Sequence, residues 1–334
     1  MKIDEKAAEK FTALMIEKIK TMTENWKKPW ISERIVTNNF KPRNINGRAY
    51  AGGNAFMLLL LCEQKSYEIP VFLTFPQARA QNVTVTTGEK AFPVYYFSYL
   101  VFHKVTNKKI SYEEYQYLTP DQQKQYRVTV LLKFYNVFNL DQTNFKTVNP
   151  EKYEKIKQEF TAPVEPEISG KPEMYTNPLL DNMLEGQTWE CPVRLVKQDQ
   201  AYYSPMSDKI VLPLKEQFID GKNFYGTLLH EIGHSTGHPT RLNRDLKNVF
   251  GSNKYGREEL VAELTSALAG LFLGISVTVR EENAAYLKSW LRSIRENPNY
   301  LFTTLNDAAK AVKYICSRLE METGEEETTE IPAA

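Results

Sequence analysis

The sequence LLHEIGHSTGH, residues 228–238, contains three of the four histidines of this 334-residue chain. In a helix His230 and His234 leave the same face one turn apart, because 3.6 residues complete a turn. That spacing suits two ligands of one metal ion, and Glu231 lies beside them where a carboxylate can take a proton from metal-bound water. An apolar stripe before the histidines and Gly237 after them favour a helix here. Because HExxH fixes only three positions, a structural helix with incidental histidines is the competing interpretation.

A catalytic zinc site normally has three protein ligands, so one more is needed. The next expected helix, in YGREELVAELTSALAGLF (255–272), offers Glu259 and Glu263, four residues apart. We predict that Glu259 binds the metal and that Glu263 accepts the N–H of a ligand histidine. Glu258 lies about 100° around the helix from Glu259 and is expected in solvent. His238 is the alternative third ligand, although its spacing does not fit the three-histidine form of the motif.

The composition is that of an ordinary globular protein, with 42% hydrophobic and 25% charged residues. No apolar run of about 18 residues occurs, and MKIDEKAAEK at the start has no apolar core of a signal peptide behind it. We therefore expect a cytoplasmic protein with no membrane partner. The three cysteines lie far apart and form no CxxC pair, which favours neither a disulfide framework nor a thiolate metal site.

The net charge of +1 conceals a difference between the two halves. Residues 1–150 contain 21 Lys and Arg against 13 Asp and Glu, a balance of +8, whereas residues 151–334 contain 21 against 28, a balance of −7. A basic half suggests a polyanionic partner, and solvated charged faces are the alternative interpretation.

Basic and aromatic residues alternate in an irregular segment, residues 25–54. Cations that follow phosphates and aromatic rings that stack on bases are the combination that binds single strands without reading their sequence. The predicted DNA contacts are Trp26, Lys27, Lys28, Trp30, Lys41, Arg43, Arg48, Tyr50 and Asn54. Aromatic residues that anchor a long loop in the core are the competing explanation. Asn54 also suits the N-cap of the apolar helix that follows.

Hydrophobic periodicity predicts an α+β protein in two domains. In the first half we expect helices at 4–22, 55–65 and 150–160 and strands at 69–75, 83–87, 91–101 and 127–140, with a polar insertion or hairpin extension before the last strand. In the second half we expect strands at 192–198, 201–204 and 209–213, followed by helices. The predicted units are a first domain at 1–160, a linker at 161–175, a second domain at 176–322 and a disordered acidic tail at 323–334.

Ordered blocks in both halves resemble the ArdC-type antirestriction proteins of plasmids and other mobile elements. They include NGRAYAGGNAFML, FLTFPQARAQN and GEKAFPVYYF in the first half, and YYSPMSDKIVLP, HEIGHSTGHPTRLNR and YGREELVAEL in the second. The resemblance implies an N-terminal single-stranded-DNA-binding domain and a C-terminal zincin-like metallopeptidase domain. It also implies that His230 and His234 bind metal, that Glu231 is catalytic and that REELVAE supplies the third ligand.

The resulting hypothesis is an antirestriction-type protein that binds single-stranded DNA and cleaves an unspecified protein or peptide. Its cofactor is expected to be a zinc ion, Zn2+, or another divalent metal such as Mn2+. The alternative is a protein that shields the DNA strand, with a metal site that is structural or silent.

Overall fold

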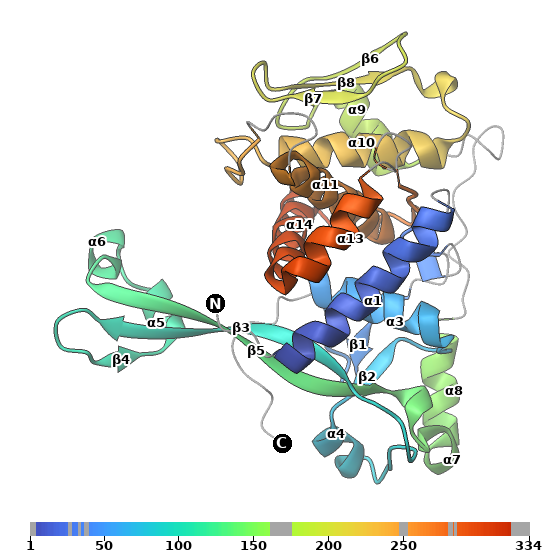
Figure 1. Cartoon of the computed structure of the whole chain (residues 1–334), viewed down its shortest axis with the longest axis vertical. Helices are drawn as coiled ribbons and strands as arrows, with labels where there is room; N and C mark the ends of the chain where they lie inside the picture. Colours follow the sequence, from blue (N-terminus) through green and yellow to red (C-terminus); the bar gives the residue numbers. More distant parts are fainter. Residues whose placement is uncertain are drawn as a thin grey trace.

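The computed structural model describes residues 5–25, 29–32, 35–36, 40–160, 176–246, 253–279, 283 and 286–321. It confirms the α+β prediction, with two sheets and many helices (Figure 1). Trp26, Lys27 and Lys28, the predicted linker and the predicted acidic tail lie outside the described residues. Within the described ranges, no helix combines the length and hydropathy that a bilayer crossing requires.

The sheet of the first half has five strands in the described part of the chain, in the order β1-β2-β5-β3-β4. These are β1 (Arg43–Asn44), β2 (Val71–Leu73), β3 (Phe92–His103), β4 (Lys109–Ile110) and β5 (Tyr126–Asn139). The long antiparallel pair β3 and β5 runs in register from Phe92 opposite Val137 to His103 opposite Tyr126. Three of the four strands predicted for this half are thereby confirmed.

The strand predicted at 83–87 is wrong, although its β-branched residues suit a strand. Val85 forms an isolated bridge with Thr143. The amide of Thr84 donates to the Asn144 side chain and that of Thr86 to the Gln142 carbonyl. The backbone of this segment is therefore satisfied by the turn that follows β5, and it has no strand to pair with.

The ends of β3 and β5 project from the body as an arm, which confirms the predicted hairpin extension (Figure 1). The arm, residues 98–131, also contains β4 and the short helices α5 (Tyr112–Gln116) and α6 (Pro120–Gln123). Each helix begins with a capping box, Ser111 with Glu114 in α5 and Thr119 with Gln122 in α6. These reciprocal hydrogen bonds satisfy amides that short helices would otherwise leave unpaired.

Helices pack around this sheet. They are α1 (Glu5–Glu24), α3 (Gly52–Lys65), α4 (Phe75–Ala80), α7 (Phe145–Val148) and α8 (Pro150–Gln158). The apolar α3 is a core helix as predicted, but it begins at Gly52, so Ala51 and not Asn54 is its N-cap. A Cβ atom on Gly53 would lie 2.2 Å from the Tyr95 hydroxyl oxygen of β3. Gly53 therefore permits close approach of helix and sheet.

The second half has a sheet whose described strands follow the order β6-β8-β7, with helices beneath it. Its strands β6 (Val193–Val196), β7 (Tyr202–Ser204) and β8 (Lys209–Pro213) confirm the prediction. Its helices are α9 (Pro178–Gly186), α10 (Gly221–Ser235), α11 (Asn253–Phe272), α13 (Leu287–Glu296) and α14 (Pro298–Arg318). The helix α9 is not among the predicted elements. The Asp220 side chain accepts the Asn223 amide at 2.7 Å and so begins α10.

The two halves share one hydrophobic core. Helix α1 packs against α13, and α3 packs against α14 (Figure 1). The Phe302 ring of α14 lies 5.2 Å from the Phe11 ring of α1 and 5.7 Å from the Tyr95 ring of β3, between ring centroids. The second half of the chain therefore packs against the sheet of the first half through buried aromatic rings.

Candidate metal centre

Helices α10 and α11 bring His230, His234 and Glu259 together. The two histidine Nε2 atoms are 3.1 Å apart. A Glu259 carboxylate oxygen lies 3.3 Å from Nε2 of His230, and the other lies 3.6 Å from Nε2 of His234. Ligand atoms at such separations can all reach one ion at about 2.1 Å, the usual zinc–nitrogen and zinc–oxygen distance. The structure thus assembles the three residues predicted as metal ligands.

The charges in this cluster favour a cation where the three side chains meet. Burial alone would lower the pKa of His234, yet the carboxylates of Glu259 and Glu258 raise it to about 10. Burial would raise the pKa of Glu259, but the charge of His234 and the hydrogen bond from His230 hold it well below its usual range. The carboxyl group is therefore ionised and available as a ligand at neutral pH.

Glu231 follows the first ligand histidine in α10 and is 2% exposed. Its carboxylate is close enough for its charge to contribute to the raised pKa of His234. Glu231 is therefore a buried carboxylate beside the cluster and outside its set of donor residues.

Behind His230 lies Glu263, which was predicted to support a ligand histidine. Its Oε1 atom is 3.7 Å from Nδ1 of His230, a buried nitrogen with no hydrogen-bond partner among the described residues. The same oxygen accepts Nδ2 of Asn283 at 2.8 Å, and Oε2 accepts the indole N–H of Trp30 at 3.2 Å. Glu263 is 1% exposed and is held from two sides.

Behind His234 lies Glu258, which the sequence analysis placed in solvent. That expectation is wrong, because Glu258 is 8% exposed and its Oε1 lies 3.4 Å from Nδ1 of His234. Arg244 explains the burial: its guanidinium donates two hydrogen bonds to this carboxylate, at 2.7 and 3.1 Å. Arg244 also donates to the Gly233 carbonyl and to the Thr236 hydroxyl, both at 2.8 Å. Each metal histidine therefore has a carboxylate behind it.

His238, the alternative third ligand, is outside the cluster of ligand atoms. Its Nδ1 lies 2.8 Å from the Thr240 hydroxyl and 3.9 Å from an Asp208 carboxylate oxygen. Arg241 ties the same loop to the sheet through hydrogen bonds to Asp208 and to the Tyr203 hydroxyl. This part of the sequence supports the end of α10 and contributes no metal ligand among the described residues.

Three predicted DNA contacts are buried, and the interpretation of Trp30 and Tyr50 as stacking surfaces is wrong. Trp30 is 0% exposed and Tyr50 7%. Asn54 is also buried, and its amide exchanges hydrogen bonds with the backbone of Tyr95 at 2.6 and 3.0 Å. Core packing, the competing explanation, accounts for all three side chains.

The predicted cations of the same segment are partly accessible. Lys41 is exposed, and Arg48 is half-buried. Arg43 is half-buried, pairs with Glu159 at 2.5 Å and lies over the Phe160 ring at 5.1 Å. Of these three side chains, Lys41 is therefore the most accessible to a phosphate.

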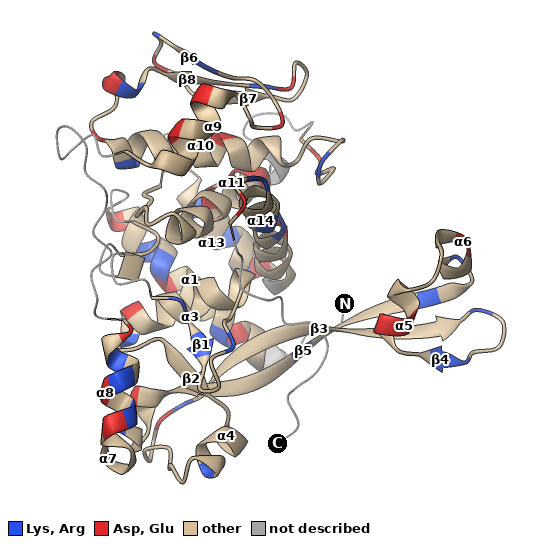
Figure 2. Ribbon diagram, turned by 180° about the vertical axis from the view of Figure 1, so that it is seen from behind, with Lys and Arg blue, Asp and Glu red and all other residues tan. Residues whose placement is uncertain are grey.

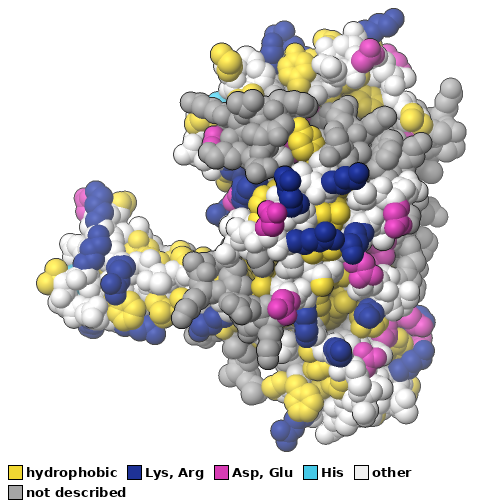
Figure 3. All heavy atoms as spheres, in the orientation of Figure 1, with side chains coloured by type: hydrophobic (Ala, Val, Ile, Leu, Met, Phe, Trp, Pro, Cys, Tyr) yellow, Lys and Arg dark blue, Asp and Glu magenta, His cyan; other side chains and the backbone are white. Residues whose placement is uncertain are grey.

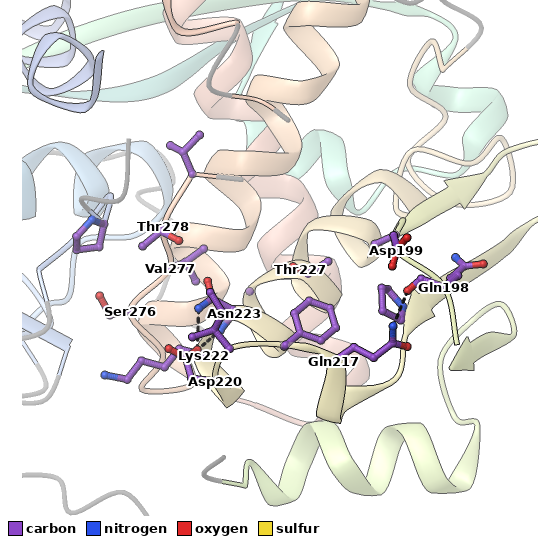
Figure 4. A pocket seen from close by; sticks show the side chains of 17 residues that line it. Gln198, Asp199, Gln217, Asp220, Lys222, Asn223, Thr227, Ser276, Val277 and Thr278 are labelled. Carbon is purple, nitrogen blue, oxygen red and sulfur yellow. Dashed lines mark hydrogen bonds between the residues drawn. The ribbon is translucent and has the colours of Figure 1, made fainter. Parts of the chain in front are cut away.

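A pocket of about 510 Å³ lies at the N-terminal end of α10. Figure 4 shows Asn223 and Thr227 of α10 between Gln198 and Asp199 on one side and Ser276 to Thr278 on the other. Thr227 precedes His230 by three residues, so the pocket comes within about one helical turn of the metal ligands.

Two family models match separate stretches of the chain. A family model described as the N-terminal domain of anti-restriction factor ArdC matches residues 5–138. A second, described as zincin-like metallopeptidase, matches residues 187–308 and contains the three ligand residues.

Relatives match nearly the whole chain. The chain is 32% identical over 330 residues to the DNA primase TraC of Escherichia coli, which covers 95% of this chain but only 27% of the primase. It is 28% identical over 310 residues to the uncharacterized protein y4eC of Sinorhizobium fredii, covering 92% of this chain and 90% of that protein. The Mn(II)-bound structure of the antirestriction ArdC protein from the R388 plasmid matches with a TM-score of 0.66 and 26% identity, over 95% of this chain and 98% of that one.

Proposed function

Because this chain is an ArdC-like protein, with the N-terminal domain of that family and a zincin-like domain, we propose that it is an antirestriction protein with a metal-dependent peptidase site. The observation that carries the proposal is the convergence of His230, His234 and Glu259 beside the buried Glu231. Two neutral histidines and one carboxylate would leave a divalent ion with net positive charge, as a Lewis acid requires.

The residues fit a divalent metal. The donor atoms are two imidazole nitrogens and a carboxylate, a set that suits zinc and also accepts manganese. The orphaned Nδ1 of His230 faces the Glu263 carboxylate, the arrangement in which metal-bound imidazoles present their second nitrogen to an anion. We propose Zn2+ as the ion, with Mn2+ as the alternative. The related R388 protein has a Mn(II)-bound structure.

A divalent ion held by His230, His234 and Glu259 would supply a Lewis acid for the scissile carbonyl and would lower the pKa of a water molecule at the site. Glu231 takes the proton of that water and returns it to the leaving amine as the C–N bond breaks. Glu258 lies 3.4 Å from Nδ1 of His234 and Glu263 lies 3.7 Å from Nδ1 of His230, so both carboxylates are on the sides of the rings that face away from the shared Nε2 position. The pocket lined by Thr227 begins one helical turn before His230, which supports a substrate chain that enters the site from that side.

Metal removal tests this function directly. The full chain loaded with Zn2+ or Mn2+ is expected to cleave peptides in a mixed-sequence library. A chelator should abolish cleavage, and the metal should restore it, because no other group in the proposed site replaces the Lewis acid. Cleavage read by mass spectrometry that persists in excess chelator would contradict the proposal.

We also propose that the first half binds single-stranded DNA. The support is its positive balance of charge together with the match to the ArdC N-terminal domain. Exposed cations gather on the arm, where Figure 2 shows basic residues along β4 and β5. They are Lys104, Lys108, Lys109, Lys124 and Arg127. Figure 3 shows several basic side chains on the arm and on the adjacent face of the body.

Charge reversal on the arm is expected to weaken DNA binding. In Lys108→Glu with Lys109→Glu, single-strand affinity should fall, and the slope of log affinity against log salt should flatten by about 1.4, since each phosphate contact contributes about 0.7. The measurement is fluorescence anisotropy with a labelled oligonucleotide at several salt concentrations.

The matched control is Arg194→Glu with Lys197→Glu, which reverses two exposed cations on the sheet of the second half. If both double variants changed the salt slope equally, the arm would have no special part in binding.

A strand-shielding protein with a silent metal site predicts that Glu231→Ala leaves antirestriction intact. The peptidase proposal predicts that it does not.

A further inference from the structure

A buried indole of the first half of the chain donates a hydrogen bond to a carboxylate beside the metal centre. The Trp30 side chain is 0% exposed, and its ring lies 6.0 Å from the Phe56 ring of α3, between centroids. Its N–H crosses to the second half and donates to the Glu263 carboxylate at 3.2 Å. The two residues are 233 positions apart in the sequence.

The backbone around Trp30 is fixed to the second half as well. The Trp30 amide donates to the Val277 carbonyl at 3.0 Å, and the Ser276 hydroxyl donates to the Ile31 carbonyl at 2.9 Å. Pro29 forms an antiparallel bridge with Thr278. Residues 29–31 therefore lie along residues 276–278 in the manner of a short added strand, which holds the indole in place.

Glu263 occupies the position between this indole and the metal ligand. Its Oε1 atom faces Nδ1 of His230 at 3.7 Å, and its Oε2 atom accepts the indole N–H. A carboxylate that accepts a hydrogen bond from the second ring N–H of a metal-bound imidazole fixes the orientation of the ring and raises its basicity. The indole bond restricts the rotation of that carboxylate and stabilises its charge in the core.

We infer that Trp30 is a positioning residue for the metal centre, acting through Glu263 on His230. The zincin-like region at 187–308 contains the ligands, but on this inference it does not build the complete site by itself. The first half supplies a hydrogen bond that sets how tightly the metal is held. This inference rests on the proposed metal site and concerns its affinity.

The test measures Mn2+ affinity of the full chain, with free ion followed by electron paramagnetic resonance. Glu263→Gln is expected to weaken binding about 10–100-fold, the usual effect of losing an outer-sphere partner. Trp30→Phe should weaken it about three- to tenfold, because it removes one of the groups that hold Glu263. In the Glu263→Gln background, Trp30→Phe should have little further effect, because the two residues act in one series.

The matched control is Trp290→Phe. Trp290 is also 0% exposed and also donates its indole N–H, but the acceptor is the Gly256 carbonyl at 2.6 Å and not the Glu263 carboxylate. It should change Mn2+ affinity less than twofold. Equal weakening in Trp30→Phe and Trp290→Phe, or additive effects of Trp30→Phe and Glu263→Gln, would overturn the inference.

A measurement on the parent chain covers the case in which Trp30→Phe does not fold. In protein labelled with ¹⁵N-tryptophan, Zn2+ should shift the indole resonance of Trp30 and leave that of Trp290 in place. The Trp30 signal is assigned by elimination with Trp→Phe variants of Trp26, Trp189 and Trp290. An unmoved Trp30 signal in zinc-loaded protein would overturn the role of Trp30 but would leave the proposed metal function intact. A parent that bound neither ion would contradict the proposed metal function as well.

Discussion

A Glu231→Gln variant is expected to bind the metal as the parent does and to cleave peptides about 10²–10⁴ times more slowly. Glutamine keeps the size of the side chain but cannot take a proton from a metal-bound water. Glu231 is not one of the three clustered ligand residues, so its replacement leaves the donor set intact. Single-turnover cleavage of a peptide selected from the library, at saturating metal, measures the effect.

Glu216→Gln is the control for Glu231→Gln. Glu216 is an exposed carboxylate shortly before α10 and should be replaceable without effect. Metal content of both variants is measured beside the rates, so that loss of the ion is not mistaken for loss of the base. Metal-dependent cleavage that continued at the parent rate in Glu231→Gln would exclude this carboxylate as the proton carrier.

Glu259→Gln is expected to reduce metal affinity by more than about 100-fold. That is a larger effect than the loss of a residue that only hydrogen-bonds to a ligand. The change replaces a charged ligand by a neutral amide and leaves two histidines, a poor set for a divalent ion. Isothermal titration with Zn2+ under chelator competition measures the difference.

The adjacent Glu258 offers a close comparison for Glu259. Both side chains are buried in α11, but Glu258 lies behind His234, on its Nδ1 side, and is held by Arg244. Glu258→Gln should therefore weaken binding about 10–100-fold. If Glu258→Gln had the larger effect, the assignment of the two carboxylates would be reversed.

Sequence periodicity predicted the candidate site correctly where the relevant residues lie on one helix. Helical periodicity places His230 and His234 on one face, and the four-residue spacing of Glu259 and Glu263 places both toward that face. The structure brings the predicted ligands together for this reason. Strands with long runs of β-branched and aromatic residues, such as 127–140, were also predicted correctly, because their local sequence pattern agrees with the way they pack.

Side chains that depend on distant partners could not be predicted. Glu258 is buried because Arg244 neutralises it, and no periodicity within α11 reveals that pairing. Trp30 contacts Glu263 across 233 residues, so its place behind the metal centre followed only from the tertiary structure. Composition also cannot separate an aromatic ring that stacks on DNA from one that fills a core, which is why Tyr50 was misassigned.

Anomalous diffraction from crystals of the parent chain soaked in Mn2+ tests the central claim most directly. One strong peak is expected where Nε2 of His230, Nε2 of His234 and the Glu259 carboxylate converge, with Glu231 beside the ion but not bound to it. A peak that included His238 in place of Glu259, or manganese bound only elsewhere on the protein, would contradict this assignment of the site.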